Sequence, residues 1–121
     1  MELPQISIFL ENKPGQLCAV TDILAKAGIN LEAINIAEST DYGVLRLITS
    51  DSEKAKQLLD EKKYLTRIDN VMSLEINDEV GGLGKELARL SEEGIDIEYM
   101  YSVFGGKEGK ALLVIKPKKK G

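Results

Sequence analysis

The amino-acid sequence predicts an α+β fold made of two related units, in which antiparallel sheets carry helices on one face. Three observations predict this fold. A set of residues repeats after 66 positions, strand-like runs alternate between apolar and polar residues, and stripes of apolar residues with helical spacing follow those runs. The first unit is predicted as βαββαβ, and the second is predicted to be truncated to βαββ.

The repeat is clearest where a strand-like run leads into a helix-like one. ENKPGQL at residues 11–17 is followed 66 positions later by NDEVGGL at residues 77–83, and we call these segments the first and the second elbow. After one added residue, VLRLI at residues 44–48 matches ALLVI at residues 111–115. Seven identities share the spacing of 66 without a gap: Ser7 with Ser73, Gly15 with Gly81, Leu17 with Leu83, Leu24 with Leu90, Gly28 with Gly94, Ile29 with Ile95, and Glu32 with Glu98.

The first strand and the first helix of each unit follow from the spacing of apolar residues. Every second residue faces one side of a strand, whereas residues three and four apart share one side of a helix. A glycine after the last apolar position is typical of a helix C-terminus. The residues concerned are Ile6, Ile8, Leu10, Leu17, Val20, Leu24 and Gly28 in the first unit, and Met72, Leu74, Ile76, Leu83, Leu87, Leu90 and Gly94 in the second.

The second strand of each unit changes parity. Apolar residues stand at Ile29 and Leu31 and then at Ile34 and Ile36, which predicts a bulge or a bend, and the later copy has the same change. Turn residues around positions 41–43 and 105–109 predict a hairpin into the third strand.

Only the first unit continues beyond its third strand. Ser50 and Glu53 have the spacing of a capping box, Leu58 and Leu59 belong to a short apolar stripe, and residues 64–68 have the composition of a fourth strand. The first unit therefore has a ferredoxin-like element order. We expect a first domain over residues 1–69, an incomplete second domain over residues 70–116 and a basic tail over residues 117–121.

Composition excludes several classes of function. The chain has 121 residues, a formal net charge of −4 and no histidine, so a His-assisted nucleophile or a His-bearing metal site is excluded, and we predict no cofactor and no metal. The acidic balance argues against nucleic-acid binding. The lack of a signal-like start and of a long apolar run predicts a cytoplasmic protein without membrane contact. The single cysteine, Cys18, agrees with that location.

Several segments resemble ACT domains. They are ENKPGQL, AGINLEAINIAE and VLRLITSD in the first unit, and DEVGGLGKELARLSEEGIDIEYMYSV in the second, while LTRIDNV is similar to linkers of tandem ACT proteins. The resemblance covers almost the whole chain. It implies a non-catalytic module that binds a small ligand, most often an amino acid, and reports it to an enzyme or a regulator.

The elbows are the predicted ligand site. The first backbone N–H groups of a helix have no intrahelical partner and the helix dipole favours an anion there, so an α-carboxylate could dock on an elbow. The side-chain oxygens of Asn12 and Asp78 could accept a hydrogen bond from an α-ammonium group. Two elbows at a domain interface would therefore hold both ends of a zwitterion. By resemblance, the site residues are Asn12, Lys13, Pro14, Gly15, Gln16, Leu17, Asp78, Gly81, Gly82 and Leu83, with Ile34 and Met100 lining the pocket.

The two elbows are not equally good candidates. Pro14 matches the loop pattern of the family, whereas Val80 replaces it in the second copy, so the first elbow is favoured. The alternative is that Gly15 and Gly81 serve only as tight-turn residues.

Three classes of function remain open. The first is an amino-acid-binding regulatory module, and the second is an oligomerising regulatory subunit of an amino-acid metabolic enzyme, without a ligand of its own. The third is an enzyme that uses carboxylates such as Glu11 or Asp78.

We also predict a homodimer or a larger assembly. A second unit with one helix would leave apolar side chains exposed. The side chains of Val44 and Ile48 point to the same face of the sheet, and those of Leu113 and Ile115 are expected to point to the equivalent face in the second unit, which no helix covers. The alternative is that the first unit shields the second within one chain.

Overall fold

The structure of the protein is a computed structural model that describes residues 2–11, 13–38, 42–104 and 107–118. The chain divides into two compact units. The N-terminal unit is Pro4–Asp69, and the C-terminal unit is Asn70–Gly121 together with Met1–Leu3. None of the helices in the described ranges has the length and apolar character that crossing a bilayer requires.

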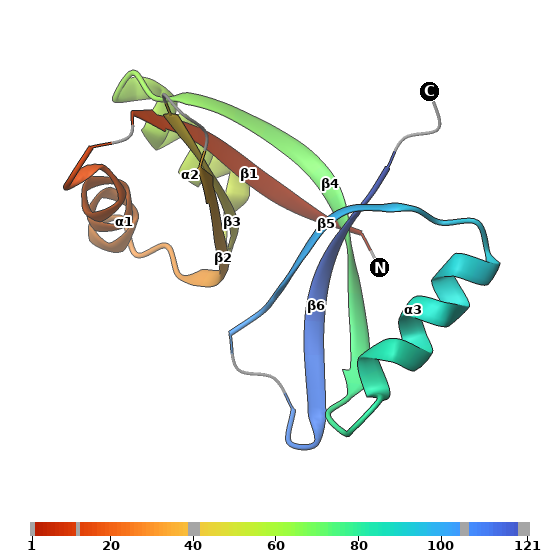
Figure 1. The fold of residues 1–121 in the computed structure, drawn as a ribbon. Coiled ribbons are helices and arrows are strands. Elements are labelled where there is room, and N and C mark those ends of the chain that lie inside the picture. The colour runs from red at the N-terminus through yellow and green to blue at the C-terminus, as the bar shows by residue number, and fades with distance from the viewer. Residues whose placement is uncertain (1, 12, 39–41, 105–106, 119–121) are drawn as a thin grey trace. The chain divides into compact units, whose positions relative to one another are not determined.

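The N-terminal unit has the predicted βαββαβ order (Figure 1). Its strands lie in the order β2-β3-β1-β4, which is the ferredoxin-like arrangement. The elements are β1 Glu2–Glu11, α1 Gln16–Lys26, β2 Leu31–Glu38, β3 Tyr42–Thr49, α2 Ser52–Glu61 and the first part of β4 Leu65–Asn77.

Both helices of this unit cover the same face of the sheet. Ile6 and Ile8 of β1 lie opposite Leu47 and Leu45 of β3, and all four side chains are fully buried. They form one core with Val20 and Leu24 of α1 and with Ala55 and Leu59 of α2. Burial of each large side chain contributes about 1.5–3 kcal/mol, so this core fixes α1 against the sheet.

The C-terminal unit has the predicted βαββ order. It contains the second part of β4, α3 Gly82–Glu92, β5 Ile97–Ser102 and β6 Lys110–Pro117, and its strands lie in the order β4-β6-β5. Met72 and Leu74 are only partly buried, whereas the equivalent Ile6 and Ile8 are fully buried. This difference agrees with a sheet that carries one helix instead of two.

Glycines end α1 and α3 as predicted. Gly28 and Gly94 have φ of +75° and +76°, and each belongs to a Schellman motif. In the first motif the N–H of Ile29 donates to the carbonyl of Leu24, and in the second the N–H of Ile95 donates to the carbonyl of Leu90, each at 3.0 Å.

The predicted change of parity is present in both second strands. The register of β2 with β3 shifts between Leu31 and Ala33, and the register of β5 with β6 shifts between Ile97 and Tyr99. After its bulge, β2 places Ile36 opposite Leu45, on the face that the helices cover.

One local prediction was wrong. Ser50 does not cap α2, because the cap is Asp51, whose carboxylate accepts the N–H of Lys54 at 3.1 Å. The Ser50 hydroxyl oxygen accepts the N–H of Asn30 instead. The strand predicted at residues 64–68 is present as the first part of β4, which begins at Leu65 and contains the whole of LTRIDNV.

The predicted alignment of residues 44–48 with residues 111–115, in the third strands of the two units, was also wrong by one residue. Ile8 pairs with Leu45, and its equivalent Leu74 pairs with Leu113, so the matching residues lie 68 positions apart and two residues are added in the later copy. A slip of one residue turns a side chain to the other face of a sheet. Leu113 and Ile115 therefore share the face of Leu74, not the helix-free face predicted for them.

Candidate functional site

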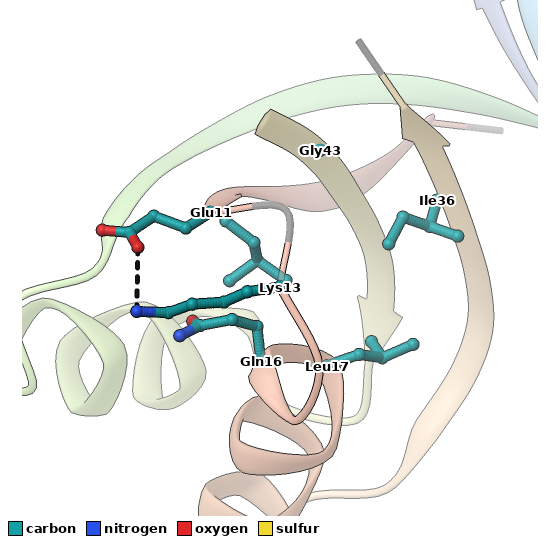
Figure 2. A pocket seen from close by; sticks show the side chains of 7 residues that line it. Glu11, Lys13, Gln16, Leu17, Ile36 and Gly43 are labelled. Carbon is teal, nitrogen blue, oxygen red and sulfur yellow. Dashed lines mark ion pairs between the residues drawn. The ribbon is translucent and has the colours of Figure 1, made fainter. Parts of the chain in front are cut away.

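A hollow of about 270 Å³ lies at the first elbow (Figure 2). Gly43 of β3, which stands opposite Leu10 of β1, lines it without contributing a side chain. We call it the elbow hollow. Among the described residues it is lined by Leu10, Glu11, Lys13, Gln16, Leu17, Ile36 and Gly43.

The backbone of the elbow is set by Gly15, the N-cap residue of α1, which has φ of +89°. A residue with a Cβ is strained in this left-handed conformation. Because glycine has no side chain, it gives no capping bond to the N–H groups of Leu17 and Cys18 in the first turn. These groups and the positive end of the helix dipole favour an anion at the start of α1.

The elbow hollow has a polar wall. Lys13 Nζ lies 3.0 Å from Glu11 Oε2, and the side chain of Gln16 extends beside this ion pair (Figure 2). The two charged side chains are 58 % and 76 % exposed, so their attraction contributes about 0–1 kcal/mol. Such a weak pair holds neither charge firmly in place.

The opposite wall is apolar. Leu17 of α1 and Ile36 of β2 lie on this side (Figure 2). Ile36 is 51 % exposed although it is a large apolar residue. The elbow hollow therefore combines two opposite charges with an uncovered hydrophobic surface.

Only part of the predicted site lines this hollow. Lys13, Gln16 and Leu17 do, whereas Pro14 and Gly15 form the exposed turn before α1. Asn12 lies outside the described residues. The predicted Ile34 packs against the core of the N-terminal unit.

Sequence reasoning missed four residues of the lining. The sequence contains a signal for three of them. Leu10 and Ile36 continue the apolar alternation of their strands, and Glu11 begins the elbow motif. Gly43 gave no such signal, because its role depends on the pairing of β3 with β1.

The second elbow repeats the backbone of the first. The N–H of Glu79 donates to the carbonyl of Asn77 at 2.9 Å, as the N–H of Lys13 donates to the carbonyl of Glu11. Gly81 has φ of +80° and caps α3. The two copies therefore share the hydrogen bond that starts the turn and the left-handed glycine that caps the helix.

The side chains of the second elbow differ. Ala111 stands opposite Ile76, where the first copy has Gly43 opposite Leu10, so a methyl group lies where the first copy has none. Glu79 takes the position of Lys13 and lies 3.8 Å from Lys85. An acidic group at this position disfavours a carboxylate.

The remaining predicted residues of the second unit differ in exposure. Asp78 is exposed, and its N–H donates to the carbonyl of Gly109. Gly82 is buried, Leu83 is 37 % exposed, and Met100 of β5 is partly buried opposite Ile115.

Titratable groups with shifted pKa lie outside the elbows. A hydrogen bond from Thr66 and then the contact with Lys56 lower the pKa of Asp60 at the end of α2. Glu86 and then Glu93 raise the pKa of Arg89 on α3. The described residues contain no group of three or more potential metal ligands.

Similar proteins identify the family. The sequence matches the ACT domain pair family over residues 1–120. A crystal structure of a Bacteroides thetaiotaomicron protein is 44 % identical, covers 98 % of this chain and 81 % of that one, and has a TM-score of 0.90. No curated protein sequence matches the chain.

Two more distant structures share the fold. The regulatory subunit of aspartate kinase from Thermus thermophilus, in its ligand-free form, is 15 % identical over 93 % of this chain and 81 % of that one, with a TM-score of 0.70. A structure of the aspartokinase alpha and beta subunits is 20 % identical over 94 % of this chain and 85 % of that one, with a TM-score of 0.61. By the family match and the Bacteroides structure, this chain belongs to the ACT domain pair family.

Proposed function

We propose that the protein is a non-catalytic regulatory module that binds an amino acid at the first elbow. The observation that carries this proposal is the elbow hollow, where the Glu11–Lys13 pair faces the apolar wall beside the start of α1. Its volume of about 270 Å³ suits a ligand smaller than a drug-sized molecule, for which pockets of roughly 300–1,000 Å³ are usual.

The charges of a bound amino acid would replace the internal ion pair. The α-ammonium group would bind the Glu11 carboxylate, and the α-carboxylate would bind Lys13 and the first-turn N–H groups of α1. The apolar part of the ligand would lie on Leu17 and Ile36. The ligand would therefore contact both the polar and the apolar wall of the hollow.

The proposed partner of this module is an enzyme of amino-acid metabolism. Support comes from the ACT family and from the structural similarity to a regulatory subunit of aspartate kinase. We further propose a homodimer, because Met72 and Leu74 in the C-terminal unit are less buried than their counterparts under the two helices of the N-terminal unit.

Calorimetry against the twenty amino acids tests the function. At a hundredfold excess over the dissociation constant, a ligand of the folded state also stabilises it by about 2.7 kcal/mol, so thermal unfolding gives a second measurement. We expect Glu11→Gln and Lys13→Gln each to weaken binding at least tenfold. Lys85→Gln is the matched control, because Lys85 is an exposed lysine at the second elbow.

Two results would contradict this proposal. If none of the amino acids binds, the oligomerising subunit without a ligand becomes the better account. If one binds and neither variant of the Glu11–Lys13 pair weakens it, the ligand does not occupy the first elbow.

A further inference from the structure

A second hollow adjoins the elbow hollow within the N-terminal unit. It has a volume of about 340 Å³ and shares Leu10, Glu11 and Gln16 with the first. We call it the rear hollow. Its remaining lining consists of Phe9, Tyr42, Lys62, Lys63, Tyr64 and Leu65.

Two lysines line the rear hollow. Lys62 and Lys63 follow directly after α2, and both are exposed. Within the described ranges of the chain, neither ammonium group forms an ion pair or a side-chain hydrogen bond. No residue that the structure describes therefore pairs directly with either ammonium group.

Lys63 also has a strained backbone. Its φ is +71°, and it occupies the left-handed position of a Schellman motif that is filled by Gly28 after α1 and by Gly94 after α3. The N–H of Lys63 donates to the carbonyl of Asp60, and the N–H of Tyr64 donates to the carbonyl of Leu59. A lysine costs free energy where glycine would not, and strain of this kind is concentrated at functional sites.

The other charges around the rear hollow do not cancel these lysines. The Glu11 carboxylate lies 3.0 Å from the exposed Lys13, and in the proposed complex it would bind the α-ammonium group instead. Asp60, which precedes them on α2, is held by Thr66 and Lys56. Among the described residues, the lining of the rear hollow thus carries two lysines and one carboxylate, an excess of one positive charge.

We propose that the rear hollow is a subsite for an anionic side chain, so that the ligand of the first elbow is an acidic amino acid. This inference rests on the proposed function. The α-carboxylate and the α-ammonium group occupy the elbow hollow, and the side-chain carboxylate reaches past Gln16 to Lys62 and Lys63. The amide N–H of Gln16 stands between the two hollows and can donate to either carboxylate.

The test compares acidic amino acids with their amides, which have nearly the same shape. Calorimetry at low ionic strength should show aspartate or glutamate binding at least tenfold more tightly than asparagine or glutamine. The preference should shrink as salt is added, because both lysines are exposed. O-phosphoserine distinguishes a carboxylate subsite from a phosphate subsite and should bind more weakly than the acidic amino acid.

Variants of the lysines separate recognition from folding. Lys63→Gly should abolish the preference for the acidic side chain and at the same time raise the midpoint of thermal unfolding, because it removes the strain. Lys62→Gln should reduce the preference without that gain. Lys26→Gln, at the end of α1 and outside both hollows, should leave the preference unchanged.

The outcomes distinguish this inference from the function on which it rests. If a neutral amino acid binds as tightly as its acidic counterpart, and its binding requires Glu11 and Lys13, the acidic subsite is wrong and the proposed function stands. If the preference survives Lys63→Gly and Lys62→Gln, the rear hollow is not the subsite. If no amino acid binds, both proposals fail.

Discussion

Gln16 and Gly82 occupy the same position in the two elbows, yet a Cβ atom on Gly82 would lie 2.2 Å from the carbonyl oxygen of Asn77. Gln16 extends a side chain beside the ion pair of the first elbow (Figure 2). The second elbow is tighter at this point, since the N–H of Gly82 lies 3.0 Å from the carbonyl of Glu79, whereas the equivalent bond of Gln16 is 3.5 Å long. The two elbows therefore share a turn but not a binding surface.

Gly82→Ala should destabilise the protein. The added methyl group meets backbone, which cannot turn away as a side chain does, and overpacking of this kind costs about 1–3 kcal/mol. Gln16→Ala is the matched control and should change the free energy of unfolding by less than about 0.5 kcal/mol, as partly exposed positions do. Urea unfolding measures both, and equal effects would show that the second elbow relaxes freely.

Gly43→Ala should weaken amino-acid binding and leave the fold intact. Its Cβ would meet the carbonyl oxygen of Ala37 at 3.6 Å and Ile36 at 3.8 Å, which are ordinary contacts, but it would partly fill the elbow hollow. We expect a loss of at least threefold in affinity by calorimetry. Ala111→Gly makes the opposite change at the second elbow, and it should not alter affinity.

Thr49→Val should stabilise the protein by about 1 kcal/mol, because a buried hydroxyl group without a hydrogen bond carries a desolvation cost. Thr49 of β3 is 9 % exposed, and its Oγ1 is buried without a hydrogen-bond partner in the described part of the chain. Thr21→Val provides the contrast, since Thr21 Oγ1 donates to the carbonyl of Cys18 at 3.0 Å and should not be stabilised by the change. A fall in the free energy of unfolding for Thr49→Val would show that the Thr49 hydroxyl group forms a stabilising hydrogen bond after all.

Thr66→Val should raise the pKa of Asp60 towards its ordinary value. Thr66 is the main cause of the lowered pKa and Lys56 the second, so the variant loses the larger effect. A lowered pKa in the folded state contributes stability at pH values above the ordinary carboxyl range, and this contribution disappears as the pH falls through the folded pKa. The difference in stability between wild type and variant should therefore be present at pH 7 and vanish in acid. Carboxyl chemical shifts followed by NMR would measure the pKa directly.

Much of the fold was predictable because it depends on local periodicity. The alternation of Ile6, Ile8 and Leu10 predicted β1, and Gly28 marked the end of α1. The change of parity after Leu31 predicted a bulge that the strand register confirms. Each of these signals is contained within one element, so no knowledge of the partner strand was needed.

What sequence reasoning missed depends on pairing between distant elements. Gly43 lines the elbow hollow opposite Leu10, and only the register of β3 with β1 reveals that relationship. The same limit explains why Leu113 was given the wrong face, since the length of the preceding hairpin sets its parity. The contribution of Lys62 and Lys63 to the rear hollow likewise requires the end of α2 to lie beside the end of β1.

The place of β1 in the sheet has a consequence for how the chain is made. β1 is synthesised first, but it lies between β3 and β4, and β4 begins only at Leu65. Until the ribosome has released that segment, one edge of this largely buried strand stays unpaired. Contacts between residues so far apart in the chain also slow folding. A chain that stops before Leu65 would expose the edge of β1 permanently, and we expect such a fragment to aggregate rather than to fold.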